Sequence, residues 1–278
     1  MRLGGPLLTP FDGPAGWIAA LRERGYSAAY CPVGADADDA TVRAYRQAAD
    51  EAGIVIAEVG AWSNPLSPDD SERNAAIRKC QEQLALADRI GARCCVNIAG
   101  SRGRKWDGPH PDDLTEASFG LIVDSVREII NAVKPARTYY ALETMPWMYP
   151  DSADSYLTLL QAVDRPRFAV HLDPANLISS PQRYFRNGEL IRDCFAKLGP
   201  LVRSCHAKDV VLRDSFMVHL DEVRPGLGGL DYSAFLRELS RLPDNTPLML
   251  EHLPNEDEYA AAATYIRDIA ARHTLSLG

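Results

Sequence analysis

The chain has 278 residues and a formal net charge of −8, and hydrophobic residues make up 46% of it. This acidic balance argues against a nucleic-acid partner, because nucleic-acid-binding proteins normally carry a basic face. No apolar run approaches the ~20 residues that span a bilayer, and the N-terminal MRLGGPLLTPFDGPAG lacks the long apolar stretch of a signal peptide. We therefore expect a globular cytoplasmic protein with no membrane partner.

Six cysteines are present, and none belongs to a CxxC pair. Cys94 and Cys95 are adjacent on a predicted strand, so their side chains point to opposite faces. We expect free, mostly buried thiols in a reducing cytoplasm.

Short apolar, β-branched runs alternate with longer amphipathic runs along the whole chain. This alternation is typical of a parallel sheet whose strands are joined by crossover helices. The predicted strands are Leu3–Leu8, Ala28–Val33, Ile54–Gly60, Arg93–Ala99, Thr138–Glu143, Arg167–Asp173, Val202–Ala207 and Pro247–His252.

The amphipathic runs predict the helices. Three of them end next to Gly25, Gly53 or Gly91, the residue type favoured just past a helix C-terminus. Ser71 is the predicted N-cap of the third helix. The predicted helices cover residues 15–24, 38–52, 71–90, 112–134, 152–163, 182–198, 231–241 and 256–272.

Eight successive βα units predict a single (β/α)8 TIM barrel over residues 1–278. A doubly wound open sheet is the alternative, but no GxGxxG follows the first strand and no GxxxxGK[ST] occurs. Two connections are long, residues 100–111 and residues 208–230. Both follow strand C-termini, where barrel enzymes place their functional loops.

Four consecutive predicted strands carry polar residues at their C-terminal ends: Glu143, Asp173, His206 and Glu251. Each alone could be a satisfied loop or core residue, but together they should lie at similar height around one side of the barrel mouth. Three carboxylates and one imidazole form an oxygen-rich ligand set. We expect one divalent cation here, Mn²⁺ first, with Mg²⁺, Co²⁺ or Zn²⁺ as alternatives. Without a cation, the converging carboxylates would repel one another or take up protons.

At these residues the chain resembles the xylose-isomerase-like superfamily of TIM barrels, which includes sugar phosphate isomerases, ketose 3-epimerases, inosose dehydratases and endonuclease IV. The motifs are LETMPW around Glu143, HLDPAN around Asp173, CHAKD around His206 and LEHLP around Glu251. The segment RPGLGGLDY (224–232) resembles the PGxGxxD/Y element of the group. The run DPANLISSPQRYFRNGELIRDCF resembles a branch that acts on 3-keto-glycosides, which includes 4-epimerases and C-glycoside deglycosidases.

The sequence departs from two members of this superfamily. Asn176 stands where ketose 3-epimerases carry a substrate-orienting histidine. Endonuclease IV needs further histidine ligands at strand ends, and Glu58, Asn97 and Asn176 stand there instead. We therefore do not expect this protein to recognise its substrate as the 3-epimerases do, and we do not expect it to be a nuclease.

The resemblance implies a divalent-metal-dependent sugar isomerase or epimerase that removes a proton next to a carbonyl, through a metal-stabilised enediolate. It implies that Glu143 and Glu251 exchange protons with the substrate while Asp173 and His206 mainly hold the metal. The alternative is a 3-keto-glycoside lyase or C-glycoside deglycosidase using the same metal site. A dehydratase or an endonuclease IV-like nuclease is a more distant alternative.

Elimination needs an acid for the leaving group, and Lys208 and His171 are the candidates. Each lies two residues from a metal ligand, so strand alternation points both the same way as that ligand. A salt bridge is the structural alternative for Lys208, and a hydrogen bond to a ligand is the alternative for His171.

Other residues are candidates for contact with a small sugar or keto-glycoside substrate. Arg224 either binds the substrate or anchors its own loop, and His219 and His252 are expected to be structural or surface residues. Related barrels predict a homo-oligomer, or a small partner subunit if the protein is a deglycosidase. The substrate-binding candidates are Asn176, Trp62, Trp106, Trp147, Asn97, Glu58 and Arg224.

Overall fold

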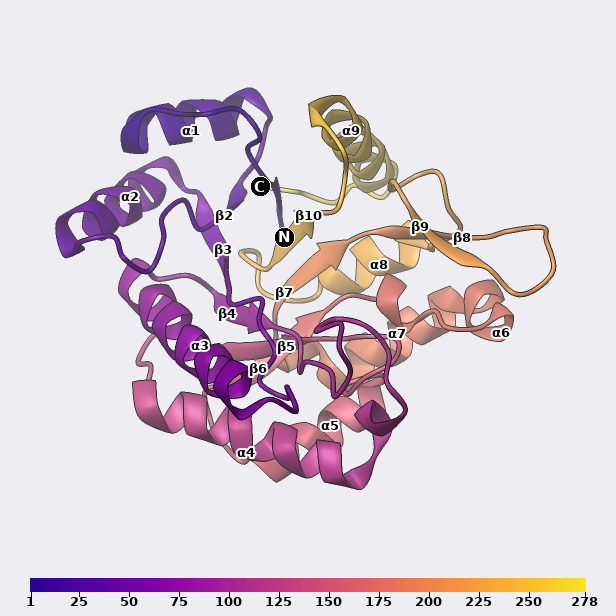
Figure 1. Ribbon diagram of the computed structural model, residues 1–278. Coiled ribbons are helices and arrows are strands. Elements are labelled where there is room, and N and C mark those ends of the chain that lie inside the picture. Colours follow the sequence, from indigo (N-terminus) through magenta and orange to yellow (C-terminus); the bar gives the residue numbers. More distant parts are fainter.

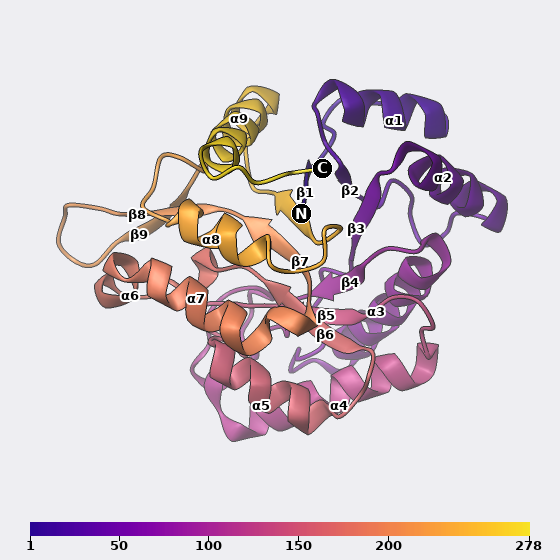
Figure 2. The same cartoon turned by 180° about the vertical axis from the view of Figure 1, so that it is seen from behind.

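The computed structural model describes residues 1–278 and contains eight parallel strands that close into a barrel (Figure 1). The strand order around the barrel is β1-β10-β7-β6-β5-β4-β3-β2. Helices surround the barrel on the outside, as the views from the two opposite sides show (Figures 1 and 2). The fold is a (β/α)8 TIM barrel, which confirms the predicted fold class and excludes the open doubly wound sheet.

Seven of the barrel strands are shorter than the apolar runs that predicted them, and β7 has the predicted bounds. The predicted first strand reached Leu8 but ends at Gly5, and the predicted last strand reached His252 but ends at Leu250. The residues beyond these points form the loops of the mouth. The barrel strands are β1 Arg2–Gly5, β2 Ala28–Tyr30, β3 Val55–Gly60, β4 Cys94–Asn97, β5 Tyr140–Glu143, β6 Phe168–Leu172, β7 Val202–Ala207 and β10 Pro247–Leu250.

The helices follow the predicted amphipathic runs with two differences. The predicted helix 182–198 is divided into α6 and α7, and a short 3-10 helix, Pro111–Leu114, precedes α4. None of the helices combines the length and the apolarity that a membrane-spanning segment requires. The helices are α1 Gly13–Glu23, α2 Asp39–Ala52, α3 Asp70–Ile90, α4 Glu116–Val133, α5 Ala153–Val163, α6 Pro181–Phe185, α7 Asn187–Leu198, α8 Tyr232–Leu239 and α9 Glu256–Arg272.

Local capping explains where the helices begin and end. Gly53 and Gly91 follow α2 and α3 in the left-handed region, with φ of 68° and 82°, which only glycine adopts without strain. The predicted N-cap of α3, Ser71, is wrong. Asp69 caps this helix by accepting a hydrogen bond from the Glu72 amide, because a carboxylate two residues earlier reaches the first-turn amides.

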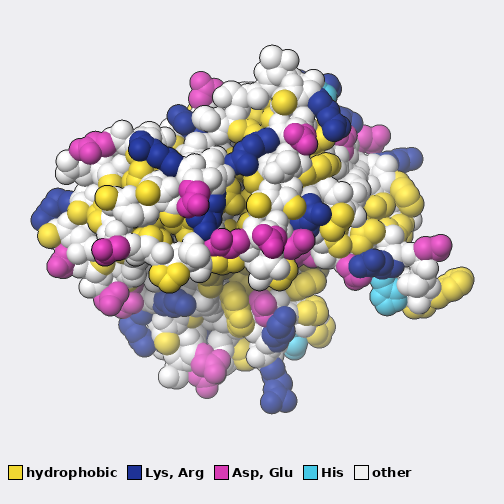
Figure 3. All heavy atoms as spheres, turned by 90° about the horizontal axis from the view of Figure 1, so that it is seen from above, with side chains coloured by type: hydrophobic (Ala, Val, Ile, Leu, Met, Phe, Trp, Pro, Cys, Tyr) yellow, Lys and Arg dark blue, Asp and Glu magenta, His cyan; other side chains and the backbone are white.

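The long connection after β7 contains regular secondary structure that the sequence analysis did not predict. It contains an antiparallel hairpin of β8, Asp209–Leu212, and β9, Leu220–Val223. The hairpin projects from the barrel at the right of Figure 1, and hydrophobic side chains gather at the same side in Figure 3. Phe216, Met217 and Val218 at its tip are all exposed.

The RPGLGGLDY segment is fastened to the end of β7 by one buried carboxylate. Asp209 accepts hydrogen bonds from the backbone amides of Gly226, Gly228 and Leu230, at 2.9 to 3.1 Å. The Tyr232 hydroxyl also donates to the carbonyl of Lys208 at 2.7 Å. The CHAKD and RPGLGGLDY motifs therefore form one structural unit, and this unit fixes the backbone of Lys208.

We predict that Asp209→Ala lowers the free energy of unfolding by about 3 kcal/mol, because it leaves buried amides without an acceptor. Urea denaturation measures this loss. The matched control is Asp214→Ala on the exposed part of the hairpin, which should leave stability unchanged. Equal stability of the two variants would show that the carboxylate does not hold the loop.

Candidate active site

Four side chains meet at the C-terminal mouth of the barrel, as the sequence predicted. Glu143 ends β5, Asp173 follows β6, His206 lies in β7 and Glu251 follows β10. One ligand atom from each lies within 4.8 Å of the corresponding atoms of the others. All except Glu251 are buried, and the Glu251 side chain is 13% exposed. We call these residues the four-ligand cluster.

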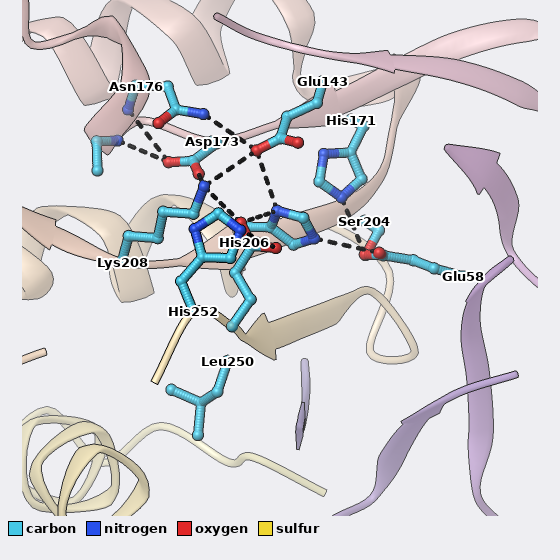
Figure 4. Close-up of polar contacts among 12 residues, drawn as sticks. Glu58, Glu143, His171, Asp173, Asn176, Ser204, His206, Lys208, Leu250 and His252 are labelled. Carbon is cyan, nitrogen blue, oxygen red and sulfur yellow. Dashed lines mark hydrogen bonds and ion pairs between the residues drawn. The ribbon is translucent and has the colours of Figure 1, made fainter. Parts of the chain in front are cut away.

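The Lys208 ammonium lies among the three carboxylates of this cluster (Figure 4). Its Nζ is 2.5 Å from Glu251 Oε1, 3.0 Å from Asp173 Oδ2 and 3.3 Å from Glu143 Oε1. The side chain is only 4% exposed. Of the two alternatives for Lys208, the salt bridge is present, and it joins three carboxylates rather than one.

Backbone and side-chain donors fix the orientation of Asp173. Its Oδ1 accepts hydrogen bonds from the amides of Ala175 and Asn176, at 2.9 and 3.3 Å. Its own amide donates to Thr144 Oγ1, and that hydroxyl donates to the Asp173 carbonyl. Oδ2 is thereby directed into the cluster.

Burial and charge act against each other on these groups. Burial would raise the pKa of Glu143, but Lys208 and His206 outweigh it and lower this pKa to about 2. Burial raises the pKa of Asp173 to about 6, against the effect of Lys208. Burial would lower the pKa of His206, but Glu251 and the other carboxylates raise it well above its usual value. The cluster therefore strongly favours positive charge in its centre.

The donor set fits a divalent cation. Asp173 Oδ2 and Glu251 Oε1 are buried and receive no hydrogen bond, although the Lys208 ammonium is near both. His206 Nδ1 faces the same point, 3.1 Å from Glu143 Oε1 and 2.7 Å from Glu251 Oε1. Oxygen-rich sites with one imidazole suit Mn²⁺, Mg²⁺ and similar ions.

A pocket of about 510 Å³ opens above the cluster. Glu143, Glu251, Lys208 and Asn176 are among the residues that line it. Its rim carries the three predicted tryptophans, each a little over one third exposed: Trp62, Trp106 and Trp147. A pocket with aromatic walls and a few convergent polar groups is typical of a small-molecule site.

The pocket rim is braced by hydrogen bonds between loops. Trp147 Nε1 donates to the Asp107 carbonyl at 3.0 Å, which joins the loop after β5 to residues 100–111. Asn176 Nδ2 donates to Glu143 Oε1 at 3.0 Å and to the Thr144 carbonyl at 3.1 Å. Asn176 therefore positions Glu143, and it also lines the pocket.

Glu58 and His171 lie below the cluster, inside the barrel and away from the pocket. His171 Nε2 is 2.9 Å from Glu58 Oε1, and both side chains are fully buried. Glu58 was predicted at the mouth as a substrate contact, but it is buried inside the barrel and does not line the pocket. His171 lacks the access to the pocket that an acid for a leaving group needs. Strand alternation gave the direction of both side chains but not their depth.

Two further predicted substrate contacts are structural. Asn97 is buried and bonds the backbone of Ser63 and the Cys80 thiol, so it faces the helices. Arg224 forms an ion pair with Glu258 at 2.8 Å, and so it anchors its own loop. Neither residue lines the pocket.

The pocket includes residues that the sequence did not single out. His252 lines it because β10 ends at Leu250 and the backbone of His252 turns into the left-handed region, with φ of 58°. His252 Nδ1 lies 3.2 Å from Glu222, which the hairpin contributes. The sequence analysis expected His252 to be a structural or surface residue. A prediction of the hairpin would have been needed to find Glu222.

The barrel and its cluster define a TIM barrel with a candidate metal centre at the strand C-termini. A family model described as xylose isomerase-like TIM barrel matches residues 18–269. The chain belongs to this family. No curated protein matches the sequence.

Solved structures with the same fold cover nearly the whole chain. A xylose isomerase-like TIM barrel protein from Mycobacterium smegmatis, in complex with magnesium, is 17% identical, with a TM-score of 0.67 and coverage of 96% of this chain and 91% of that chain. D-psicose 3-epimerase from Clostridium cellulolyticum H10, with D-tagatose, is 15% identical, with a TM-score of 0.69 and coverage of 99% of this chain and 100% of that chain. The 3-keto-D-glucoside 4-epimerase from E. coli is 12% identical, with a TM-score of 0.67 and coverage of 96% of this chain and 99% of that chain. At these identities the likeness shows the fold.

We predict that Mn²⁺ raises the melting temperature, because a ligand that binds only the folded state adds about 2.7 kcal/mol at one hundred times its Kd. Asp173→Asn removes one negative ligand and should weaken Mn²⁺ binding at least about tenfold. Calorimetric titration measures the Kd for Mn²⁺ of the wild type and of the variant. The control, Glu82→Gln on the exposed face of α3, should bind like the wild type. Equal Kd values for Asp173→Asn and the wild type would place the cation elsewhere.

Proposed function

We propose that the protein is a divalent-metal-dependent sugar isomerase or epimerase that moves a proton next to a carbonyl. The observation that carries this proposal is the pair Glu143 and Glu251. They come from β5 and the end of β10, strands that are not neighbours in the barrel. Both line the pocket floor and both contact His206 Nδ1. A binding protein would not need two carboxylates placed in this way.

The two glutamates divide the proton transfer between them. One takes the proton from the carbon next to the carbonyl, and the bonding electrons move onto the carbonyl oxygen to give an enediolate. The other returns a proton to the opposite face or to the neighbouring carbon. A bound divalent cation supplies stabilisation of the negative charge that develops on the substrate oxygens.

The remaining residues prepare the glutamates for this task. Glu143 makes its contacts with Asn176, His206 and Lys208 through Oε1, which leaves Oε2 for the substrate proton. The Lys208 ammonium adds positive charge on the pocket floor, where the enediolate forms. Asp173 and His206 are the residues that would hold the cation.

The related structures support a sugar as the substrate. Two of them are described as a D-psicose 3-epimerase and a 3-keto-D-glucoside 4-epimerase. Both act on carbonyl-bearing sugars by name, and three tryptophans at the pocket rim suit the apolar face of a sugar ring. The magnesium complex of a third supports a divalent cation.

A second candidate is elimination from a 3-keto-glycoside, and Lys208 favours it. Its ammonium lines the pocket beside Glu143 and Glu251, where it would face a leaving group bound there. After proton removal by a glutamate, the enediolate electrons expel the leaving group, and Lys208 protonates that group. The pocket of about 510 Å³ also exceeds what one hexose ring fills, which leaves space for an aglycone.

We predict that the protein, loaded with Mn²⁺ in D₂O, incorporates deuterium next to the carbonyl of keto-sugars or 3-keto-glycosides. Glu143→Gln and Glu251→Gln should each slow this exchange by about 10²- to 10⁴-fold, the usual contribution of a general base. NMR follows the exchange, with Glu82→Gln as the control. Full exchange in either glutamine variant would remove that glutamate as an essential base.

Lys208→Met separates the two candidates at saturating Mn²⁺. If the protein eliminates, aglycone release should fall by about 10²-fold more than deuterium exchange does, because the leaving-group proton is lost in addition to the charge beside the enediolate. Chromatography of the aglycone measures the release. No release from any 3-keto-glycoside by the wild-type protein would exclude elimination and leave epimerisation.

A further inference from the structure

Beneath the four-ligand cluster lies a second polar group inside the barrel, made of Glu58, His171 and Ser204. Glu58 Oε2 lies 3.2 Å from His206 Nε2, and its Oε1 lies 2.9 Å from His171 Nε2. The Ser204 hydroxyl also bonds Oε1. Figure 4 shows Glu58 on one side of the His206 ring and Glu143 and Asp173 on the other. The side chains of Glu58, His171 and His206 are fully buried.

The hydrogen bonds identify Oε1 of Glu58 as an acceptor. Ser204 Oγ has no other partner, so it donates its proton to Glu58. His171 Nδ1 is buried without a partner, and an unpaired N–H there would be costly. The single proton of His171 therefore lies on Nε2 and is donated to Glu58. With two donors on Oε1, the remaining oxygen is available to the Nε2–H of His206.

We propose that Glu58 is a positioning residue that holds His206 with its proton on Nε2 and its Nδ1 lone pair directed at the cation. This inference rests on the metal dependence of the proposed function. A ligand histidine must be neutral with one nitrogen free, and the partner of the other nitrogen decides which one. His171 and Ser204 hold the carboxylate that makes this choice. The His171 and His206 rings also pack edge to face, with centroids 4.1 Å apart.

Two other arrangements account for the contacts less well. A second metal ion among Glu58, His171 and His206 is possible by distance. However, both Glu58 oxygens already accept hydrogen bonds, and only three protein ligands are present. The reverse tautomer of His206 would place a proton on Nδ1, where the cation binds, and would require a protonated Glu58. The two hydrogen bonds that Ser204 and His171 donate to Oε1 favour the ionised carboxylate instead.

The inference is tested by the affinity for Mn²⁺ and by the protonation of His206. In Glu58→Gln, the side chain keeps its shape but loses its charge and one acceptor, so Mn²⁺ affinity should fall about 10- to 100-fold. The matched control is Ser204→Ala, which removes a partner of Glu58 but leaves the contact with His206, and its loss should be much smaller. Affinity of Glu58→Gln equal to that of the wild type would overturn the proposal.

A second measurement needs only the wild-type protein and so does not depend on the folding of the variant. In the Zn²⁺-loaded protein, ¹H–¹⁵N NMR of the imidazoles should show His206 protonated at Nε2 and not at Nδ1. A proton on Nδ1, or no cation binding at all, would overturn the proposal. Neither readout requires turnover. If the protein shows the expected Mn²⁺ affinity and the expected His206 tautomer but no reaction with sugars, the proposed reaction is rejected and the role of Glu58 stands.

Discussion

The concentration of negative charge inside the barrel is the constraint on which the rest of this site depends. Glu58, Glu143, Asp173 and Glu251 are gathered around one imidazole, and none has free access to water. Buried carboxylates at such distances must be compensated by cations or by protons. Lys208 provides part of this compensation, and a divalent ion in the four-ligand cluster would provide the rest. Under the proposed function, the same carboxylates would also supply the bases for proton transfer.

The scaffold holds these charges with backbone groups. Asp209 and Tyr232 fix the chain on the C-terminal side of Lys208, and Thr144 holds Asp173. Each support lies beyond the end of a barrel strand, so the barrel sets the height of the cluster and the segments beyond it set its orientation. Polar groups whose positions are fixed in this way can stabilise developing charge without reorganising during the reaction.

Much of this arrangement could be predicted from the sequence, because a parallel barrel brings the ends of successive strands together. The order Glu143, Asp173, His206, Glu251 was therefore readable as one site. The depth of the side chains in the barrel and the residues at which the strands end could not be predicted from the sequence. Period-two alternation gives the face of Glu58 and His171 but not their distance from the mouth, and it fails at His252, where the backbone turns after Leu250. The hairpin that brings Glu222 to the pocket lies in a segment with no strong periodic signal.

Diffraction from crystals soaked in Mn²⁺, recorded at the manganese absorption edge, would locate the cation. We expect one anomalous peak coordinated by Glu143, Asp173, His206 Nδ1 and Glu251, with Glu58 bonded to His206 Nε2. A peak elsewhere, or none at a concentration that saturates binding in solution, would contradict this expectation.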